Sequence, residues 1–228
     1  MLQAPVEGIL LIDKPENKTS FFLVKRLRSL TKVKKIGHAG TLDPFATGLM
    51  VLLIGKNYTR KSDLFLNHDK SYIATLKLGY TTPSFDKETE ITPVADKVPT
   101  DVELKSVIDS FQGEILQTPP MFSAKKVQGK PLYELARQGI SIERKACSVK
   151  VFIELLSYSY PEVVIKVTCS KGTYIRSLGH DIGQKLGTGA YLTALRRLNS
   201  GSFNINTALT LEEIEAQPEL IRQRVLTD

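Results

Sequence analysis

Apolar positions along the chain follow two spacings, and the spacing predicts the type of each element. Residues 8–12 and 50–54 are continuous apolar runs bounded by turn residues, which is typical of buried strands. From residue 71 to residue 78 apolar and polar positions alternate, which predicts a strand with one buried face. That face carries Tyr72, Ala74, Leu76 and Leu78.

Helices are predicted where apolar residues recur every three or four positions after a capping residue. Thr19 or Ser20 begins a helix that runs to about Leu30, with Leu23, Val24, Leu27 and Leu30 as its apolar stripe. Capping boxes at Thr100 and Thr210 open two more helices, the first of them ended by Gly113. Further helices are predicted over 131–139 and 174–186.

The second half of the chain mixes predicted strands with these helices. Residues 145–158 and 163–169 are predicted as paired strands, residues 193–205 as another strand, and residues 115–129 as a loop that contains Pro119-Pro120. No regular strand–helix–strand rhythm appears, so the pattern favours an α+β fold over a doubly wound sheet. A length of 228 residues suits one large domain or two small ones.

The basic charge of the chain indicates a polyanionic partner. The formal net charge is +7, and the sequence pI is about 9.3. Six basic residues and no acid lie between Lys25 and Lys35, and seven basic residues face two acids between Met121 and Lys150. Each run alone is typical of a solvated face. The two runs, however, lie on either side of a loop with a candidate catalytic acid, described below, and together they favour nucleic acid as the partner. The two cysteines, Cys147 and Cys169, form no metal or disulfide pattern, and Cys169 fits a buried strand.

The candidate catalytic loop is the stretch Gly37-His38-Ala39-Gly40-Thr41-Leu42-Asp43-Pro44-Phe45-Ala46-Thr47-Gly48-Leu49-Met50. Three glycines and a proline exclude the interior of a helix or of a central strand. The loop therefore presents Asp43, with His38 close by in sequence. An aspartate before proline is also a common turn residue, so Asp43 alone does not decide the chemistry.

Further segments of the chain belong to the same set of sequence motifs as this loop. They are the turn Asp13-Lys14-Pro15-Glu16-Asn17-Lys18-Thr19-Ser20, the strand segment Lys70-Ser71-Tyr72-Ile73-Ala74, the segment Met121 to Tyr133, the segment Ser170-Lys171-Gly172-Thr173-Tyr174-Ile175-Arg176, and Leu195-Arg196-Arg197-Leu198. In order and spacing they resemble the motifs of the TruB family, which makes pseudouridine in the T-loop of tRNA. Two positions depart from that pattern: Asn17 replaces a turn glycine, and Pro83-Ser84-Phe85-Asp86 replaces a D-T-x-D motif. Asn tolerates positive φ, so the turn is expected to survive.

The resemblance implies an α+β pseudouridine synthase fold with a mixed, largely antiparallel sheet flanked by helices and loops. It implies one catalytic domain over residues 1–228 with an RNA-gripping insertion near 115–150. Many bacterial members carry a C-terminal RNA-binding PUA domain, which we do not find here. We therefore expect recognition limited to the T-arm of tRNA, with little grip on the acceptor end.

The resemblance also implies roles for individual residues. Asp43 matches the catalytic aspartate, Arg176 its ion partner, and Tyr72 the residue that stacks on the target base. A neighbouring guanidinium keeps a carboxylate ionised, which the reaction requires. The alternatives are that Arg176 binds phosphate or solvent, and that Tyr72 is a strand tyrosine packed in the core.

Other matches concern the substrate. His38 corresponds to the histidine that packs against the RNA where the base is flipped out, and Tyr174 and Leu195 to residues that line the uridine pocket. A histidine bonded to nearby backbone and a purely structural leucine are the alternatives. Lys14, Lys126 and Lys130 are candidate contacts to the RNA backbone, although solvent-facing lysines would look the same.

Isomerisation of uridine needs no redox step and no group donor, so no cofactor and no metal are expected. The expected partner is the T-arm of tRNA, without an obligate protein partner, and a monomer is the default state. No signal peptide or membrane span is expected, so a reduced cytoplasmic setting is the default.

Two other function classes remain open at this point. One is a non-catalytic RNA-binding protein or RNA chaperone on the same scaffold. The other is an aspartyl phosphotransferase or hydrolase that uses Asp43. That second chemistry calls for Mg²⁺ and clustered carboxylates, and none flanks Asp43 in the sequence.

Overall fold

The chain folds into two units in a computed structural model, which describes residues 6–123, 125–127 and 129–227. The first unit takes in residues up to Ile73 and from Leu195 onward, and the second takes in Ala74–Ala194. Strands β4 (Lys70–Leu78) and β12 (Ala190–Ser200) contribute to both units and are neighbours in the sheet.

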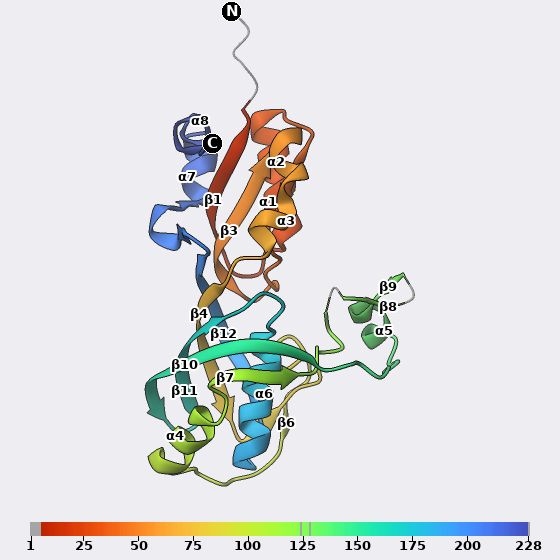
Figure 1. The fold of residues 1–228 in the computed structure, drawn as a ribbon, viewed down its shortest axis with the longest axis vertical. Helices are drawn as coiled ribbons and strands as arrows, with labels where there is room; N and C mark the ends of the chain where they lie inside the picture. Colours follow the sequence, from red (N-terminus) through yellow and green to blue (C-terminus); the bar gives the residue numbers. More distant parts are fainter. Residues whose placement is uncertain (1–5, 124, 128, 228) are drawn as a thin grey trace, which may run out of the picture. The chain divides into compact units, whose positions relative to one another are not determined.

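The first unit is built on strands in the order β14-β1-β3-β12, with β2 added to β3 and β13 added to β12. Strand β1 is antiparallel to β3, whereas β14 and β12 run parallel to their partners β1 and β3. In Figure 1, helices α1 to α3 flank β1 and β3 on one side, and α7 and α8 flank them on the other. The elements are β1 (Gly8–Lys14), α1 (Ser20–Thr31), β2 (Ile36–His38), β3 (Thr47–Ile54), α2 (Lys56–Arg60), α3 (Ser62–Leu66), β13 (Phe203–Asn204), a 3-10 turn (Ile205–Thr207), β14 (Leu209–Thr210), α7 (Leu211–Ala216) and α8 (Leu220–Arg224).

The second unit carries strands in the order β4-β11-β10-β7, with β10 antiparallel to both neighbours. Helix α4 contacts α6 and β10. Strands β8 and β9 and helix α5 form a small lobe that projects from the ends of β7 and β10 (Figure 1). The elements are β5 (Tyr80–Thr81), β6 (Thr92–Pro93), α4 (Asp101–Asp109), β7 (Gly113–Gln117), β8 (Lys126–Val127), β9 (Lys130–Pro131), α5 (Leu132–Arg137), β10 (Cys147–Ser159), β11 (Glu162–Cys169) and α6 (Ile175–Leu186).

The structure confirms the predicted helix starts and the mixed sheet. Thr19 caps α1 by accepting a bond from the Phe22 amide, and Thr100 and Thr210 form complete capping boxes. Strand β4 buries alternate residues as predicted, and Cys169 is buried. The α+β class follows, because the sheet is mixed and largely antiparallel and helices do not alternate regularly with its strands.

Helix α4 ends at Asp109, before the predicted end at Gly113. Two further predicted boundaries are wrong. The predicted loop over residues 115–129 begins in β7, whose register with β10 runs from Gly113↔Val151 to Gln117↔Cys147. The strand predicted over 193–205 begins earlier, at Ala190, and ends at Ser200 before a turn at Gly201. In both cases a long-range partner strand, and not the local apolar pattern, sets the limits of the element.

Candidate active site

The loop that carries Asp43 joins β2 to β3 in the first unit. These strands are antiparallel, with His38 opposite Leu52, so the loop leaves and re-enters the sheet at the same end. The Asp43 carbonyl accepts a bond from the Ala46 amide at 3.1 Å, which closes a turn with Pro44 in its second position. The Asp43 residue is half-buried.

Buried polar groups fix the backbone on both sides of Asp43. The Ser20 hydroxyl donates to the Leu42 carbonyl (3.1 Å) and accepts from the Leu42 amide (2.9 Å). On the other side, the Pro44 carbonyl accepts bonds from Lys14 Nζ (3.1 Å) and from the Asn17 amide (2.9 Å). The two neighbours of Asp43 are therefore each held by at least two hydrogen bonds, which preorganises the carboxylate.

Arg197 is a second anchor of this loop, and sequence reasoning did not assign it a role. Its side chain is almost fully buried and donates from Nε to the Leu49 carbonyl (2.6 Å) and from Nη2 to the Gly40 carbonyl (3.2 Å). Gly48 pairs with Arg197 in the parallel β3–β12 register and has φ +102°. A Cβ there would lie 2.3 Å from the Arg197 carbonyl oxygen, so only glycine fits.

The turn before α1 keeps its shape without the family's glycine. Asn17 has φ +61°, in the left-handed region, as expected from its tolerance of this conformation. Since the Asn17 amide bonds to the Pro44 carbonyl, this backbone geometry reaches the loop of Asp43 directly.

His38 ends β2 immediately before the loop. Burial lowers the pKa of His38, and the positive charge of Arg197 lowers it further. The imidazole is therefore neutral at neutral pH, which suits packing against RNA better than donation of a proton. Its Nδ1 is buried and has no hydrogen-bond partner among the residues that the structure describes.

Tyr72 and Leu195 lie on the neighbouring strands β4 and β12, and both side chains are largely buried. The hydroxyl of Ser71 donates to Asn199 Oδ1 at 2.9 Å and ties these two strands together in the first unit. Burial is compatible with a pocket wall and with a core position, so the roles of Tyr72 and Leu195 toward uridine stay predictions.

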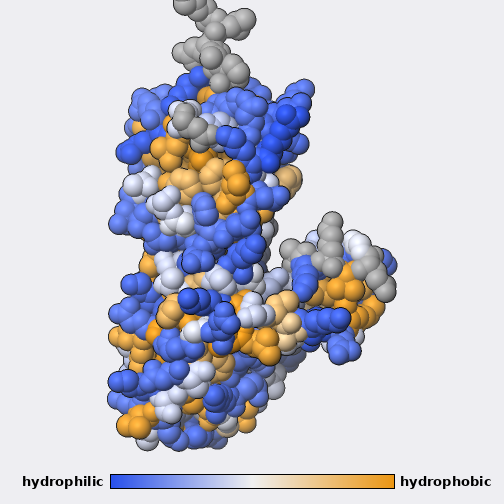
Figure 2. Space-filling model, in the orientation of Figure 1, coloured by the Kyte–Doolittle hydropathy of each residue, from blue (hydrophilic) through white to orange (hydrophobic). Residues whose placement is uncertain are grey.

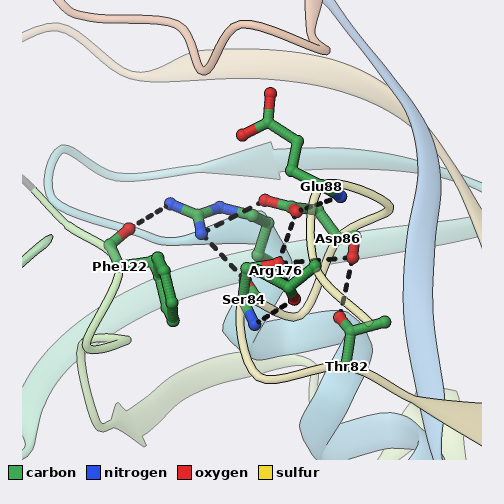
Figure 3. Close-up of polar contacts among 7 residues, drawn as sticks. Thr82, Ser84, Asp86, Glu88, Phe122 and Arg176 are labelled. Carbon is green, nitrogen blue, oxygen red and sulfur yellow. Dashed lines mark hydrogen bonds and ion pairs between the residues drawn. The ribbon is translucent and has the colours of Figure 1, made fainter. Parts of the chain in front are cut away.

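Arg176 lies in the first turn of α6 in the second unit, and the residue is 4% exposed. Figure 3 shows this side chain against the loop that follows β5. It donates to the carbonyls of Ser84 (2.8 Å) and Phe122 (2.7 Å), and its Nη1 lies 3.3 Å from Asp86 Oδ2. The buried positive charge is thus paired with a buried carboxylate, as burial of a charge requires.

Asp86 is itself held by its own loop (Figure 3). Its Oδ1 accepts from the Ser84 hydroxyl (2.6 Å) and from the Glu88 amide (2.9 Å), and its carbonyl accepts from the Thr82 hydroxyl (2.7 Å). Although residues 83–86 depart from the D-T-x-D motif, Asp86 still makes a polar contact, with Arg176. Sequence reasoning noted residues 83–86 but gave Asp86 no role.

The predicted ion pair between Asp43 and Arg176 stays a prediction, because Asp43 belongs to the first unit and Arg176 to the second. Tyr174 caps α6 next to Arg176. Its amide donates to Gln117 Oε1 (2.7 Å) and its carbonyl accepts from Gln117 Nε2 (3.0 Å), so β7 fixes the start of the helix.

The candidate RNA-backbone lysines differ from one another in their surroundings. Lys14 is fully buried, and its ammonium donates to the carbonyls of Pro15 (2.9 Å) and Pro44. This burial does not suit a phosphate contact, and the geometry makes Lys14 a support of the Asp43 loop. Lys130 in β9 is exposed, as a phosphate contact requires. The side chain of Lys126 lies outside the described part of the chain.

No helix in the part of the chain that the structure describes is both long enough and apolar enough to span a membrane. Within residues 6–123, 125–127 and 129–227, no group of three or more His, Cys, Asp or Glu side chains is arranged to hold a metal ion.

Comparison with solved structures defines the class of protein. A chain in the crystal structure of a Cbf5-Nop10-Gar1 complex superposes with a TM-score of 0.74 at 29% identity, over 96% of this chain and 59% of its own length. A chain in an H/ACA ribonucleoprotein structure with a substrate RNA containing 2′-deoxyuridine gives 0.69 at 27% identity, over 96% and 58%. This chain thus spans under two thirds of these structural relatives. The architecture is the pseudouridine synthase fold.

Family models and curated relatives narrow this class. The N-terminal domain model of the TruB family pseudouridylate synthases matches residues 28–175, and the model of the tRNA pseudouridylate synthase B C-terminal domain matches residues 176–227. The tRNA pseudouridine synthase B of Chlamydia muridarum is 57% identical over 90% of this chain and 85% of its own length. That of Protochlamydia amoebophila is 53% identical over 98% and 85%. The chain belongs to the TruB family.

Proposed function

We propose that this protein isomerises a uridine in the T-loop of tRNA to pseudouridine, with Asp43 as the catalytic residue. The observation that carries the proposal is the double anchoring of the Asp43 loop, by Ser20 at Leu42 and by Lys14 at Pro44. A turn aspartate without a catalytic role does not need a buried ammonium and a buried hydroxyl to fix its neighbours. Membership of the TruB family and the match to tRNA pseudouridine synthases support the same reaction.

The reaction breaks the bond from the ribose C1′ to N1 of the base, turns the base, and forms a bond from C1′ to C5. The proton on C5 leaves and N1 gains one, so the atoms balance without a co-reactant. Asp43 acts in its ionised form, either as a nucleophile on C1′ or as a base that removes a ribose proton. Both routes place the same carboxylate against the sugar, and no cofactor is required.

The environment of Arg176 supports its role as ion partner of Asp43. A guanidinium presents five N–H donors in a rigid fork, so one group can serve several acceptors. Asp86 and the carbonyls of Ser84 and Phe122 fix the plane of the Arg176 guanidinium. A fixed guanidinium can hold a second carboxylate in one orientation and keep it ionised at neutral pH.

The remaining residues act on the substrate. Extrusion of the target uridine from the T-loop costs a few kcal/mol, which contacts to the flipped base must offset. In the proposal, Tyr72 stacks on that base with its hydroxyl near C5, Tyr174 and Leu195 line the pocket, and neutral His38 packs where the base leaves the loop.

The insertion of residues 115–150, which includes the projecting lobe, grips the T-arm in this proposal. Its exposed cations include Lys125, Lys130 and Lys145, which suit phosphate contacts. The protein works as a monomer in the cytoplasm, as one catalytic domain.

Incubation of a T-arm transcript with the purified protein in excess EDTA, without any added cofactor, tests the proposal. Mass spectrometry or chemical mapping then reads out pseudouridine. We expect one pseudouridine, in the T-loop. No product at any position would contradict the proposal, and product formed in excess EDTA discards the alternative of a metal-dependent aspartyl phosphotransferase or hydrolase.

A further inference from the structure

A set of cations extends from α1 to α2 in the first unit, and all of them are exposed except the half-buried Arg28. Lys25 and Arg28 lie on α1 three positions apart, and Lys32 follows at its C-cap. Lys34 and Lys35 occupy the turn to β2, and Lys56 and Arg60 lie on α2. We call these seven residues the basic ridge.

Backbone contacts bring the parts of the basic ridge together. The Arg28 Nη2 donates to the Ile36 carbonyl (3.1 Å), which joins α1 to β2. The Gly55 amide donates to the Lys35 carbonyl (2.8 Å), which places Lys35 beside the start of α2. Figure 2 shows a hydrophilic surface over the side of the first unit where Figure 1 places α1 and α2.

The charge of the basic ridge is not neutralised within the described part of the chain, where none of its seven cations forms an ion pair. The carboxylate of Glu7 reaches α2 but accepts from the amide and side chain of Asn57. Glu215 of α7 pairs with Arg26 of α1, and Arg26 is not part of the basic ridge. Lys56 and Arg60 stand four positions apart on one helix, where like charges repel. Such a concentration of one sign favours a polyanion.

An aromatic side chain stands at one end of the basic ridge. Phe21 is 50% exposed, with Lys25 Nζ at 5.3 Å and Arg28 Cζ at 5.7 Å from its ring centre. Cations over an aromatic ring in a basic stripe are typical of surfaces that track a nucleic-acid backbone and stack on a base. An acidic protein partner would not need the ring to be exposed.

We infer that the basic ridge binds phosphates of the substrate tRNA as a second RNA contact surface, in addition to the insertion of residues 115–150. This inference rests on the proposed function. Strand β2 leads from Lys35 to His38, about 10 Å along the strand, so RNA that passes His38 reaches the ridge within a few nucleotides. The contacts are to phosphates, so they strengthen binding without selecting a sequence.

Nitrocellulose filter binding of a tRNA transcript at several salt concentrations tests the inference. The variant Lys34→Gln/Lys56→Gln removes two ridge charges. The matched control Lys105→Gln/Lys185→Gln removes two exposed charges from α4 and α6. We expect the ridge variant to bind roughly tenfold more weakly at about 150 mM salt. The slope of the logarithm of the binding constant against the logarithm of the salt concentration should become less steep by about 2, or about 1 per lost phosphate contact.

Further arms make the result decisive. Lys34→Arg/Lys56→Arg keeps both charges and should bind like the parent, and melting temperatures check that each variant is folded. The same titration with an isolated T-arm stem-loop locates the contacted phosphates: a loss seen with both RNAs places them in the T-arm, and a loss seen only with whole tRNA places them beyond it. Equal affinity and equal slope for ridge and control variants would overturn the inference. Pseudouridine formation by the parent protein is read separately, so failure of the proposed function is distinguishable.

Discussion

Arg176 Nη1 lies 3.3 Å from Asp86 Oδ2, with both side chains at most 5% exposed. A buried ion pair is not a strong source of net stability, because desolvation offsets most of the attraction between the charges. Its value here is orientation: the pair and two carbonyl acceptors leave the guanidinium one position in which to act. Under the proposed function, Asp86 is thus a positioning residue for Arg176, and not a catalytic residue itself.

Replacement of Asp86 by Asn removes the buried carboxylate that lies 3.3 Å from Arg176 Nη1 and puts a neutral amide in its place. We expect Asp86→Asn to lower the free energy of unfolding by about 3 kcal/mol. We also expect the fold decrease in kcat to be larger than the fold change in KM. Urea unfolding and steady-state kinetics on a T-arm transcript measure the two effects. Glu154→Gln, which breaks the exposed Lys166–Glu154 pair, is the control and should cost less than about 1 kcal/mol. Equal losses for the two variants would contradict a positioning role.

Gly48 should tolerate no side chain. In Gly48→Ala the new Cβ would collide with the backbone of Arg197, and the positive φ adds strain. We expect a loss of at least about 3 kcal/mol in unfolding free energy, read from urea midpoints. Gly187→Ala has a similar positive φ but open space around the new Cβ, and should cost only about 1 kcal/mol. If Gly187→Ala were the more damaging variant, the close approach of β3 and β12 would not be the constraint.

Ser20 connects the cap of α1 to the loop of Asp43. Ser20→Ala removes both bonds to Leu42 and leaves a buried amide and a buried carbonyl unsatisfied, at a cost of about 1–3 kcal/mol. We expect kcat to fall about tenfold or more, since small misplacement of a catalytic group is costly. Ser29→Ala, on the exposed face of the same helix, should leave both quantities near the parent values. An unchanged kcat in Ser20→Ala would show that this anchor does not hold Asp43.

Asp181 on α6 should give the protein a pH-dependent stability. Burial raises the pKa of Asp181 from 3.8 to about 6. Since the folded-state pKa is the higher one, protonated Asp181 favours folding below about pH 4, and this contribution is lost as pH rises through about 6. Asp181→Asn stays neutral, so it should exceed the parent in stability at pH 8 by about 1 kcal/mol, allowing for partial exposure, and match it near pH 4.

Urea midpoints at the two pH values measure this difference. Asp109→Asn, at the exposed end of α4, is the control and should shift the midpoint equally at both pH values. A higher urea midpoint for the parent protein than for Asp181→Asn at pH 8 would contradict the prediction.

The sequence predicted the parts of this fold that depend on local chemistry. Thr19, Thr100 and Thr210 were recognisable as helix caps because capping joins residues three positions apart. The buried face of β4 followed from strict alternation. Strand β7 was missed because Ile115 and Leu116 form no alternating pattern, and its pairing with β10 depends on residues thirty and more positions away.

Long-range polar contacts limited the prediction of the site. Lys14 looked like a surface lysine near a turn, whereas the fold buries it against the Pro44 carbonyl. Arg197 and Asp86 had no local signal of their roles, because their partners Gly40 and Arg176 lie far away in sequence. The positions of Asp43 and Arg176 in a shared motif pattern were visible, but the groups that orient them were not.

The most direct test of the central claim compares Asp43→Asn with the parent protein on the same T-arm transcript, by pseudouridine mapping and by filter binding. Asn preserves the shape of the side chain and removes the ionised oxygen. We predict that RNA binding stays within about threefold of the parent while pseudouridine falls below detection, at least about 10³-fold slower. Pseudouridine formed by Asp43→Asn at a rate close to that of the parent would contradict the account.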